Sequence, residues 1–131
     1  MPDDAQHAIA GFLNIDKPSG MTSFDVVRAV RRAAGIKRVG HAGTLDPLAT
    51  GVLPVAIGGE ATRLVDAFVD AEKAYTAEVT LGIETDTDDA EGAPVAAAPT
   101  GSVAALTTEA IAAALATFED AQLQFPPAYS A

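Results

Sequence analysis

The chain has 131 residues, of which 49% are hydrophobic, and its 8 Lys and Arg against 18 Asp and Glu give a formal net charge of -10. This length is enough for one domain, and the absence of cysteine excludes disulfides, cysteine-bound zinc, iron–sulfur clusters and thiolate nucleophiles. No apolar run approaches the roughly 20 residues of a membrane span, and the acidic start is unlike a signal peptide, so we expect a cytoplasmic protein with no membrane partner.

The basic residues are distributed unevenly. All eight lie between Lys17 and Lys73, and residues 74–131 hold nine acidic residues and no basic one. Residues 17–38 contain six basic residues against the single carboxylate of Asp25, a local balance of +5. Such a cluster forms either an ordinary solvated surface or a contact surface for a polyanion such as nucleic acid.

The first half of the chain predicts two short strands and an ordered loop. Residues 1–10 have the character of a disordered leader, and residues 11–16 are expected to form a strand. Residues 39–51 lack regular periodicity but keep apolar side chains among their glycines, which indicates an ordered loop. Residues 52–57 form an apolar run between glycines and predict a second strand, in which Pro54 favours an edge or bulge position.

A helix between these strands is defined by its capping residues. Thr22 can act as the N-cap, Asp25 follows three residues later as in a capping box, and Gly35 ends the helix. Apolar residues at helical spacing are expected on its buried face, namely Phe24, Val27 and Val30. Three arginines stand at i, i+3 and i+4 on the opposite face as a solvated stripe or a basic contact surface, namely Arg28, Arg31 and Arg32.

The second half of the chain gives shorter patterns. The sequence predicts, in order, a helix over residues 60–69, a half-buried strand over residues 74–81, an acidic turn over residues 84–92, a loose connection over residues 93–106 and a helix capped by Thr107 or Thr108. The extended apolar segment 125–131 has no capping residue or closing turn. We therefore expect the chain to be the N-terminal part of a longer protein.

The residues most able to carry chemistry lie in the loop of residues 40–51. The sequence has no phosphate-binding glycine loop, no dinucleotide fingerprint and no His-Glu-x-x-His motif, and its acidic turn lacks the glycine and final Glu of a calcium loop. Asp46 is the single carboxylate of the loop and is followed by Pro47, which predicts a rigidly presented group for nucleophilic or base chemistry. The alternative is that Asp46 only caps a turn.

Several blocks of sequence point in order to one family. They are Gly11 to Ser23, Gly40 to Gly51, Leu53 to Gly58, Glu60 to Arg63, Lys73 to Tyr75, Leu81-Gly82, Thr85 to Gly92 and Pro126 to Ala131. Together they resemble the TruB family of tRNA pseudouridine synthases. The resemblance implies an α+β fold with a mixed, largely antiparallel sheet and flanking helices, and it makes residues 11–131 the N-terminal portion of the catalytic domain.

The resemblance also implies roles for individual residues of the proposed active site. Asp46 matches the catalytic aspartate, and Tyr75 matches a tyrosine that stacks on the target uracil. His41 matches a histidine that packs into the tRNA T loop, although it could instead serve only as a structural hydrogen-bonding group. Asp89 matches an acidic position near the active site.

RNA contacts are implied for part of the basic segment. Lys17 and Arg38 match positions at which family members contact the RNA backbone, and Arg31 lies on the basic face of the expected helix. The implied partner is the T arm of tRNA, the complete protein is expected to be monomeric, and no metal or organic cofactor is implied. The target nucleotide must be flipped out of the folded T arm to react.

The implied reaction converts uridine 55 of tRNA to pseudouridine. The glycosidic C–N bond breaks, the uracil rotates and a C–C bond forms. Full-length relatives continue with an arginine that pairs with the catalytic aspartate and with a C-terminal RNA-binding domain, so residues 1–131 alone are expected to be inactive and marginally stable. Two alternatives are a relative that works with guide RNA, which shares the Gly-Thr-Leu-Asp-Pro block, and a non-catalytic RNA-binding fragment.

Overall fold

The structure is a computed structural model that describes residues 9–119 and 121–123. The chain divides into two compact units between Ala74 and Tyr75. Each unit combines helices with an antiparallel sheet, which confirms the expected mixed α+β class. Residues 1–8 of the expected leader, and the closing block of the resemblance from Pro126 to Ala131, lie outside the described residues.

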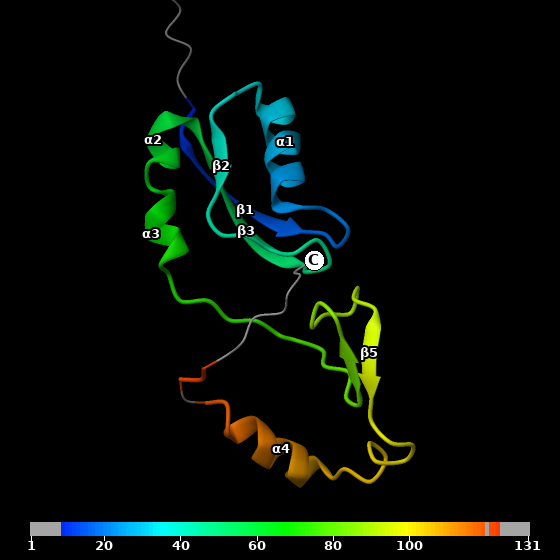
Figure 1. Cartoon of the computed structure of the whole chain (residues 1–131). Coiled ribbons are helices and arrows are strands. Elements are labelled where there is room, and N and C mark those ends of the chain that lie inside the picture. Colours follow the sequence, from blue (N-terminus) through cyan, green and yellow to red (C-terminus); the bar gives the residue numbers. More distant parts are fainter. Residues whose placement is uncertain (1–8, 120, 124–131) are drawn as a thin grey trace, which may run out of the picture. The chain divides into compact units, whose positions relative to one another are not determined.

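A three-stranded antiparallel sheet forms the base of the first unit (Figure 1). Its strands are β1 (Gly11–Lys17), β2 (Val39–His41) and β3 (Gly51–Ile57), arranged in the order β1-β3-β2. β1 and β3 pair along their full length, and β2 pairs with the end of β3. The two long strands are therefore as predicted, whereas β2 lies at the start of the segment for which only a loop was expected.

The core of the first unit lies between the sheet and helix α1 (Ser23–Ala34). Apolar side chains from the helix pack against side chains that point to one face of the strands, and these buried residues are Val26, Val27, Val30, Val39, Leu53, Val55 and Ile57. The helix bounds agree with the prediction, but one core residue does not. Phe24 is 54% exposed, because the buried stripe runs through Val26 instead.

The other face of the sheet is covered near its end by two short helices, α2 (Gly58–Thr62) and α3 (Val65–Val69). Phe68 of α3 packs against Phe12 of β1, with ring centroids 4.4 Å apart. A single helix over residues 60–69 was expected, and the break at Leu64 shows that expectation to be wrong in detail. Leu64, at the break between the two helices, is exposed.

Pro54 lies in the central strand of the first sheet, contrary to the expected edge or bulge. A residue in an antiparallel strand directs its N–H and C=O groups to the same side. The Pro54 carbonyl accepts the Ala42 N–H beyond the last residue pair of β2 and β3. Pro54 has no N–H with which to bond back to Ala42, so the pairing of β2 with β3 ends at His41 and Val55.

The second unit contains the hairpin of β4 (Ile83–Thr85) and β5 (Pro94–Ala97), followed by helix α4 (Thr108–Ala116). Thr107 caps α4 by accepting the Ala110 N–H, as predicted. The predicted strand over residues 74–81 is wrong, because no described strand pairs with these exposed residues. No helix among the described residues has both the length and the apolar character needed to cross a membrane.

Candidate active site

The loop between β2 and β3 carries the predicted catalytic carboxylate. It is bounded by Gly43 and Gly51, whose φ angles of 103° and 113° lie where side chains are rarely tolerated. The Ala42 N–H donates to the Pro54 carbonyl at 2.9 Å, and the Ala49 N–H donates to the Asp46 carbonyl at 3.0 Å. Backbone hydrogen bonds thus close the loop at its base and at its tip.

The Asp46 side chain is exposed, and among residues 9–74 no described group donates a hydrogen bond to its carboxylate. The turn at Asp46 is closed by backbone groups. The alternative that Asp46 serves only as a side-chain cap is therefore not the arrangement observed in the first unit. The carboxylate projects from the loop with its oxygens open to a reactant.

Both neighbours of Asp46 are held by the segment that connects β1 to α1. The Ser23 hydroxyl accepts the Leu45 N–H at 3.0 Å and donates to the Leu45 carbonyl at 3.2 Å. The Pro47 carbonyl accepts the Gly20 N–H at 2.8 Å. Asp46 is thus presented by a backbone that is anchored on each side.

Lys17 supplies a further anchor, and its position corrects the role expected from the sequence. Its side chain is 0% exposed, and its ammonium donates to the carbonyls of Pro18 at 3.0 Å, Met21 at 2.7 Å and Pro47 at 3.2 Å. An ammonium group has three donors, and all three are used here. Lys17 therefore ties the β1–α1 turn to the catalytic loop and has no donor left for an RNA phosphate.

His41 ends β2 and is half-buried at the start of the loop. Its Nδ1 bonds to the carbonyl of Gly43. A carbonyl oxygen can only accept, so Nδ1 carries the proton and Nε2 is left for another partner. The structural hydrogen bond considered as an alternative role for His41 is therefore present. It orients the ring and does not involve Nε2.

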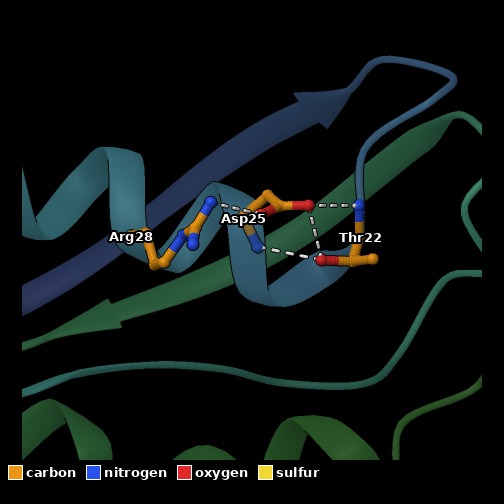
Figure 2. A network of polar contacts seen from close by, with 3 residues as sticks. All are labelled: Thr22, Asp25 and Arg28. Carbon is orange, nitrogen blue, oxygen red and sulfur yellow. Dashed lines mark hydrogen bonds and ion pairs between the residues drawn. The ribbon is translucent and has the colours of Figure 1, made fainter.

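The start of α1 is fixed by the predicted capping box, which Figure 2 shows. The Thr22 hydroxyl accepts the Asp25 N–H at 3.1 Å, and the Asp25 carboxylate accepts the Thr22 N–H at 3.1 Å. Bonds from the Thr22 hydroxyl and backbone, with a smaller effect of Arg28, hold the pKa of Asp25 below its ordinary value. The predicted start of α1 is therefore confirmed, with Ser23 as the first residue of the helix.

The arginines of α1 are not equally available to RNA. Arg28 faces Asp25 at 2.8 Å. Arg31 donates from Nη2 to the Val39 carbonyl at 2.9 Å and lies over the Phe24 ring. It also lines a shallow depression of about 560 Å³ at the end of α1, together with Arg32, Gly35, Ile36 and Lys37. Arg32 and Lys37 are exposed cations; Arg32 was predicted as part of the arginine stripe, whereas Lys37 was only counted within the basic segment.

Arg38 lies just beyond this depression, immediately before β2. Its carbonyl accepts the Gly58 N–H at 2.8 Å, and its side chain passes close to Gly59. A Cβ at Gly59 would lie 2.9 Å from the Arg38 Nη1 atom. The exposed guanidinium group therefore starts from a fixed backbone position.

The other two expected substrate residues belong to the second unit. Tyr75 is 69% exposed, so its ring has a free face. Asp89 is half-buried in the acidic turn, where one carboxylate oxygen accepts the Thr87 hydroxyl at 2.7 Å and the N–H groups of Glu91 at 2.8 Å and Gly92 at 3.1 Å. The Thr87 bond, followed by the Glu91 bond, keeps the pKa of Asp89 below its ordinary value. Its other carboxylate oxygen is not part of this network.

The described residues contain no group of three His, Asp or Glu side chains that could hold a metal ion. The groups that the loop presents are the exposed Asp46 carboxylate and Nε2 of His41, which takes no part in the bond to Gly43. Ser23 was missed as a site residue by the sequence analysis. Its place in the block from Gly11 to Ser23 gave no signal of its contact, because Leu45 lies 22 residues away.

Comparison with known proteins shows which family the chain is similar to. Residues 31–131 match the family model of the TruB family pseudouridylate synthase (N terminal domain). The tRNA pseudouridine synthase B of Desulfotalea psychrophila is 52% identical over 128 residues, which cover 98% of this chain and 51% of the relative. That of Microcystis aeruginosa is 51% identical over 121 residues, which cover 92% of this chain and 40% of the relative.

These matches define the class as pseudouridylate synthases. The chain belongs to the TruB family, and its match is to the N-terminal domain of that family. It spans about half the length or less of the relatives named above. Among solved structures, the archaeal box H/ACA sRNP Nop10-Cbf5 complex contains a chain 49% identical, with a TM-score of 0.43 and coverage of 47% of this chain and 19% of that chain.

Proposed function

We propose that the protein is a tRNA pseudouridine synthase that isomerises uridine 55 in the T loop, with Asp46 as the catalytic carboxylate. The observation that carries this proposal is an exposed carboxylate on an anchored loop, in a chain about half identical to tRNA pseudouridine synthase B. The protein acts in the cytoplasm on the T arm of tRNA, as a monomer when complete, and needs neither metal nor organic cofactor.

The reaction replaces one bond to the ribose with another. The glycosidic C–N bond breaks, the uracil rotates, and a C–C bond forms between the ribose and the base. Asp46 either attacks the ribose or base, or removes a ribose proton. Each route needs a carboxylate that can reach a flipped-out nucleotide, and the exposed side chain of Asp46 meets that need.

The remaining residues bind the substrate. The exposed ring of Tyr75 stacks on the target uracil, a contact worth about 1–3 kcal/mol in other proteins. His41 packs into the T loop, and its Nε2 is the ring nitrogen that can bond to the RNA. The carboxylate oxygen of Asp89 that is not bonded within the acidic turn contacts the substrate. Arg31 and Arg38 contact the RNA backbone, next to the depression lined by Arg31, Arg32 and Lys37.

The catalytic assignment is tested by Asp46→Asn in the complete gene product. We expect the variant to abolish pseudouridine formation in a T-arm stem–loop while RNA affinity changes by no more than a few-fold, because the shape of the side chain is kept. The measurement is tritium release from uracil C5. The matched control is Asp70→Asn, an exposed carboxylate at the end of α3. Turnover above a few per cent in Asp46→Asn would remove this role, and binding without turnover in the wild type would favour a non-catalytic RNA-binding protein.

The RNA contact is tested at Arg38 because its guanidinium is exposed. Replacing it by Gln should weaken T-arm binding and reduce the slope of log affinity against log salt by about one, since one phosphate contact is lost. The control is Arg28→Gln, whose guanidinium is already paired with Asp25. An unchanged slope in Arg38→Gln would contradict an RNA-backbone contact.

A further inference from the structure

The hydroxyl of Ser23 is bonded to the residue that precedes Asp46. Ser23 is 3% exposed and is the first residue of α1, whereas Leu45 lies in the loop between β2 and β3. One hydroxyl both accepts the Leu45 N–H at 3.0 Å and donates to the Leu45 carbonyl at 3.2 Å. We propose that Ser23 is a positioning residue for the Asp46 carboxylate, a role that rests on the proposed function of Asp46.

The two bonds act on the backbone rotations of Leu45. Its N–H belongs to the peptide plane before the residue and its C=O to the plane after it. These two planes are related by φ and ψ, the only soft backbone rotations that a residue has. Holding both planes to one buried oxygen fixes the direction in which the chain enters Asp46.

Downstream of Asp46 the backbone is restrained by other groups. The Pro47 carbonyl accepts the Gly20 N–H at 2.8 Å and the Lys17 ammonium at 3.2 Å. The Pro47 ring also favours an extended conformation at the residue before it. Ser23 therefore restrains the backbone on the N-terminal side of Asp46. Without this restraint, only the Pro47 side would be fixed, and the orientation of the Asp46 carboxylate would vary.

Positioning predicts a different outcome from a purely structural contact. Loss of the hydroxyl should lower turnover, because an error of about 1 Å in the placement of a reacting group can cost a large factor in rate. Substrate affinity should change little, since the Ser23 side chain is buried and its hydroxyl is bonded to Leu45. Leu45 also packs against the core, so the loop keeps one anchor and the fold is retained.

The test compares Ser23→Ala, Ser23→Thr and the control Thr22→Ala in the complete gene product. Thr22→Ala removes the neighbouring cap bond of α1 but no contact to the loop, so it reports the effect of weakening the same helix end. We expect Ser23→Ala to lower kcat for T-arm RNA about tenfold with Kd within about twofold, and Thr22→Ala to leave kcat unchanged. Ser23→Thr keeps the hydroxyl and should retain most of kcat.

A second readout separates this proposal from the proposed function. Amide hydrogen exchange at the Leu45 N–H should accelerate in Ser23→Ala and not in Thr22→Ala, whether or not the protein has isomerase activity. A wild type without turnover would defeat the proposed function and leave the exchange experiment to decide on the restraint. Equal kcat in Ser23→Ala and Thr22→Ala, or unchanged exchange at Leu45, would overturn the positioning role.

Discussion

The two units of the chain differ in what holds each of them in shape. In the first unit, Leu53 and Val55 are 1% and 0% exposed at the centre of an apolar core. In the second unit, none of the described residues is buried, and its turns rest on short-range hydrogen bonds such as that from Thr85 to the Asp89 carbonyl. The predicted catalytic loop belongs to the unit with the core.

This difference explains how a loop with little regular structure can present a catalytic group. The anchors on Leu45 and Pro47 come from Ser23, Gly20 and Lys17, which lie in the segment from the last residue of β1 to the first turn of α1. That segment is itself fixed because both β1 and α1 pack into the core. Polar anchors position a loop only when the groups that supply them are immobile.

The contrast between the two units is tested most strongly by removing one apolar side chain from each of them. Leu53→Ala should lower the free energy of unfolding by about 2–5 kcal/mol, because it opens a cavity in a packed core. Leu115→Ala in α4 removes an exposed side chain and should change that free energy by less than about 0.5 kcal/mol. Urea unfolding followed by circular dichroism measures both. Similar losses in the two variants would contradict the contrast between the units.

A smaller effect is expected from the buried ammonium group. Lys17→Met keeps an unbranched side chain but leaves the carbonyls of Pro18, Met21 and Pro47 without their donor. Losing the three bonds from this buried ammonium should reduce the free energy of unfolding by about 2–3 kcal/mol, while the Pro47 carbonyl keeps its bond from the Gly20 N–H. The same denaturation experiment measures the loss, and Lys37→Met, at an exposed position, is the control. A neutral Lys17→Met would show that these bonds are dispensable.

The smallest expected effect is a change in the pKa of Asp89, in the second unit. The hydroxyl of Thr87 is the largest cause of the lowered pKa of Asp89. Thr87→Val keeps the side-chain shape but removes this donor, so the pKa of Asp89 should rise toward its ordinary value of 3.8. A carboxyl titration followed by NMR measures the change. Ser102→Ala, which removes a hydroxyl bonded elsewhere in the unit, should leave it unaltered.

The sign of the pH dependence follows from the direction of that shift. The folded pKa of Asp89 lies below the unfolded value of 3.8, so the folded turn favours the ionised form. Its contribution to stability is fully present above the unfolded pKa and is lost as the pH falls through the folded pKa. Acid should therefore loosen the turn of residues 85–92 only below about pH 3.8. Loosening at neutral pH would contradict this account.

The sequence by itself determined the features that depend on neighbours along the chain. The capping box of Thr22 and Asp25, the end of α1 at Gly35 and the cap of α4 at Thr107 all use contacts within four residues, so local pattern was sufficient. The apolar runs of β1 and β3 were likewise sufficient to predict these two strands. The family and the loop around Asp46 were identified from ordered blocks of residues, and the family is confirmed.

Only the tertiary structure decided the features that depend on distant partners. Residues 74–81 alternate like a strand but find no described strand to pair with, and Pro54 occupies the central strand at the point where its pairing with β2 ends. Lys17 has the charge of an RNA-binding residue, yet the fold buries its side chain and its ammonium donates hydrogen bonds to three carbonyls. Ser23 meets Leu45 across 22 residues of chain. Pairing, burial and long-range hydrogen bonds are set by which segments the core brings together, and no local pattern of residues records that choice.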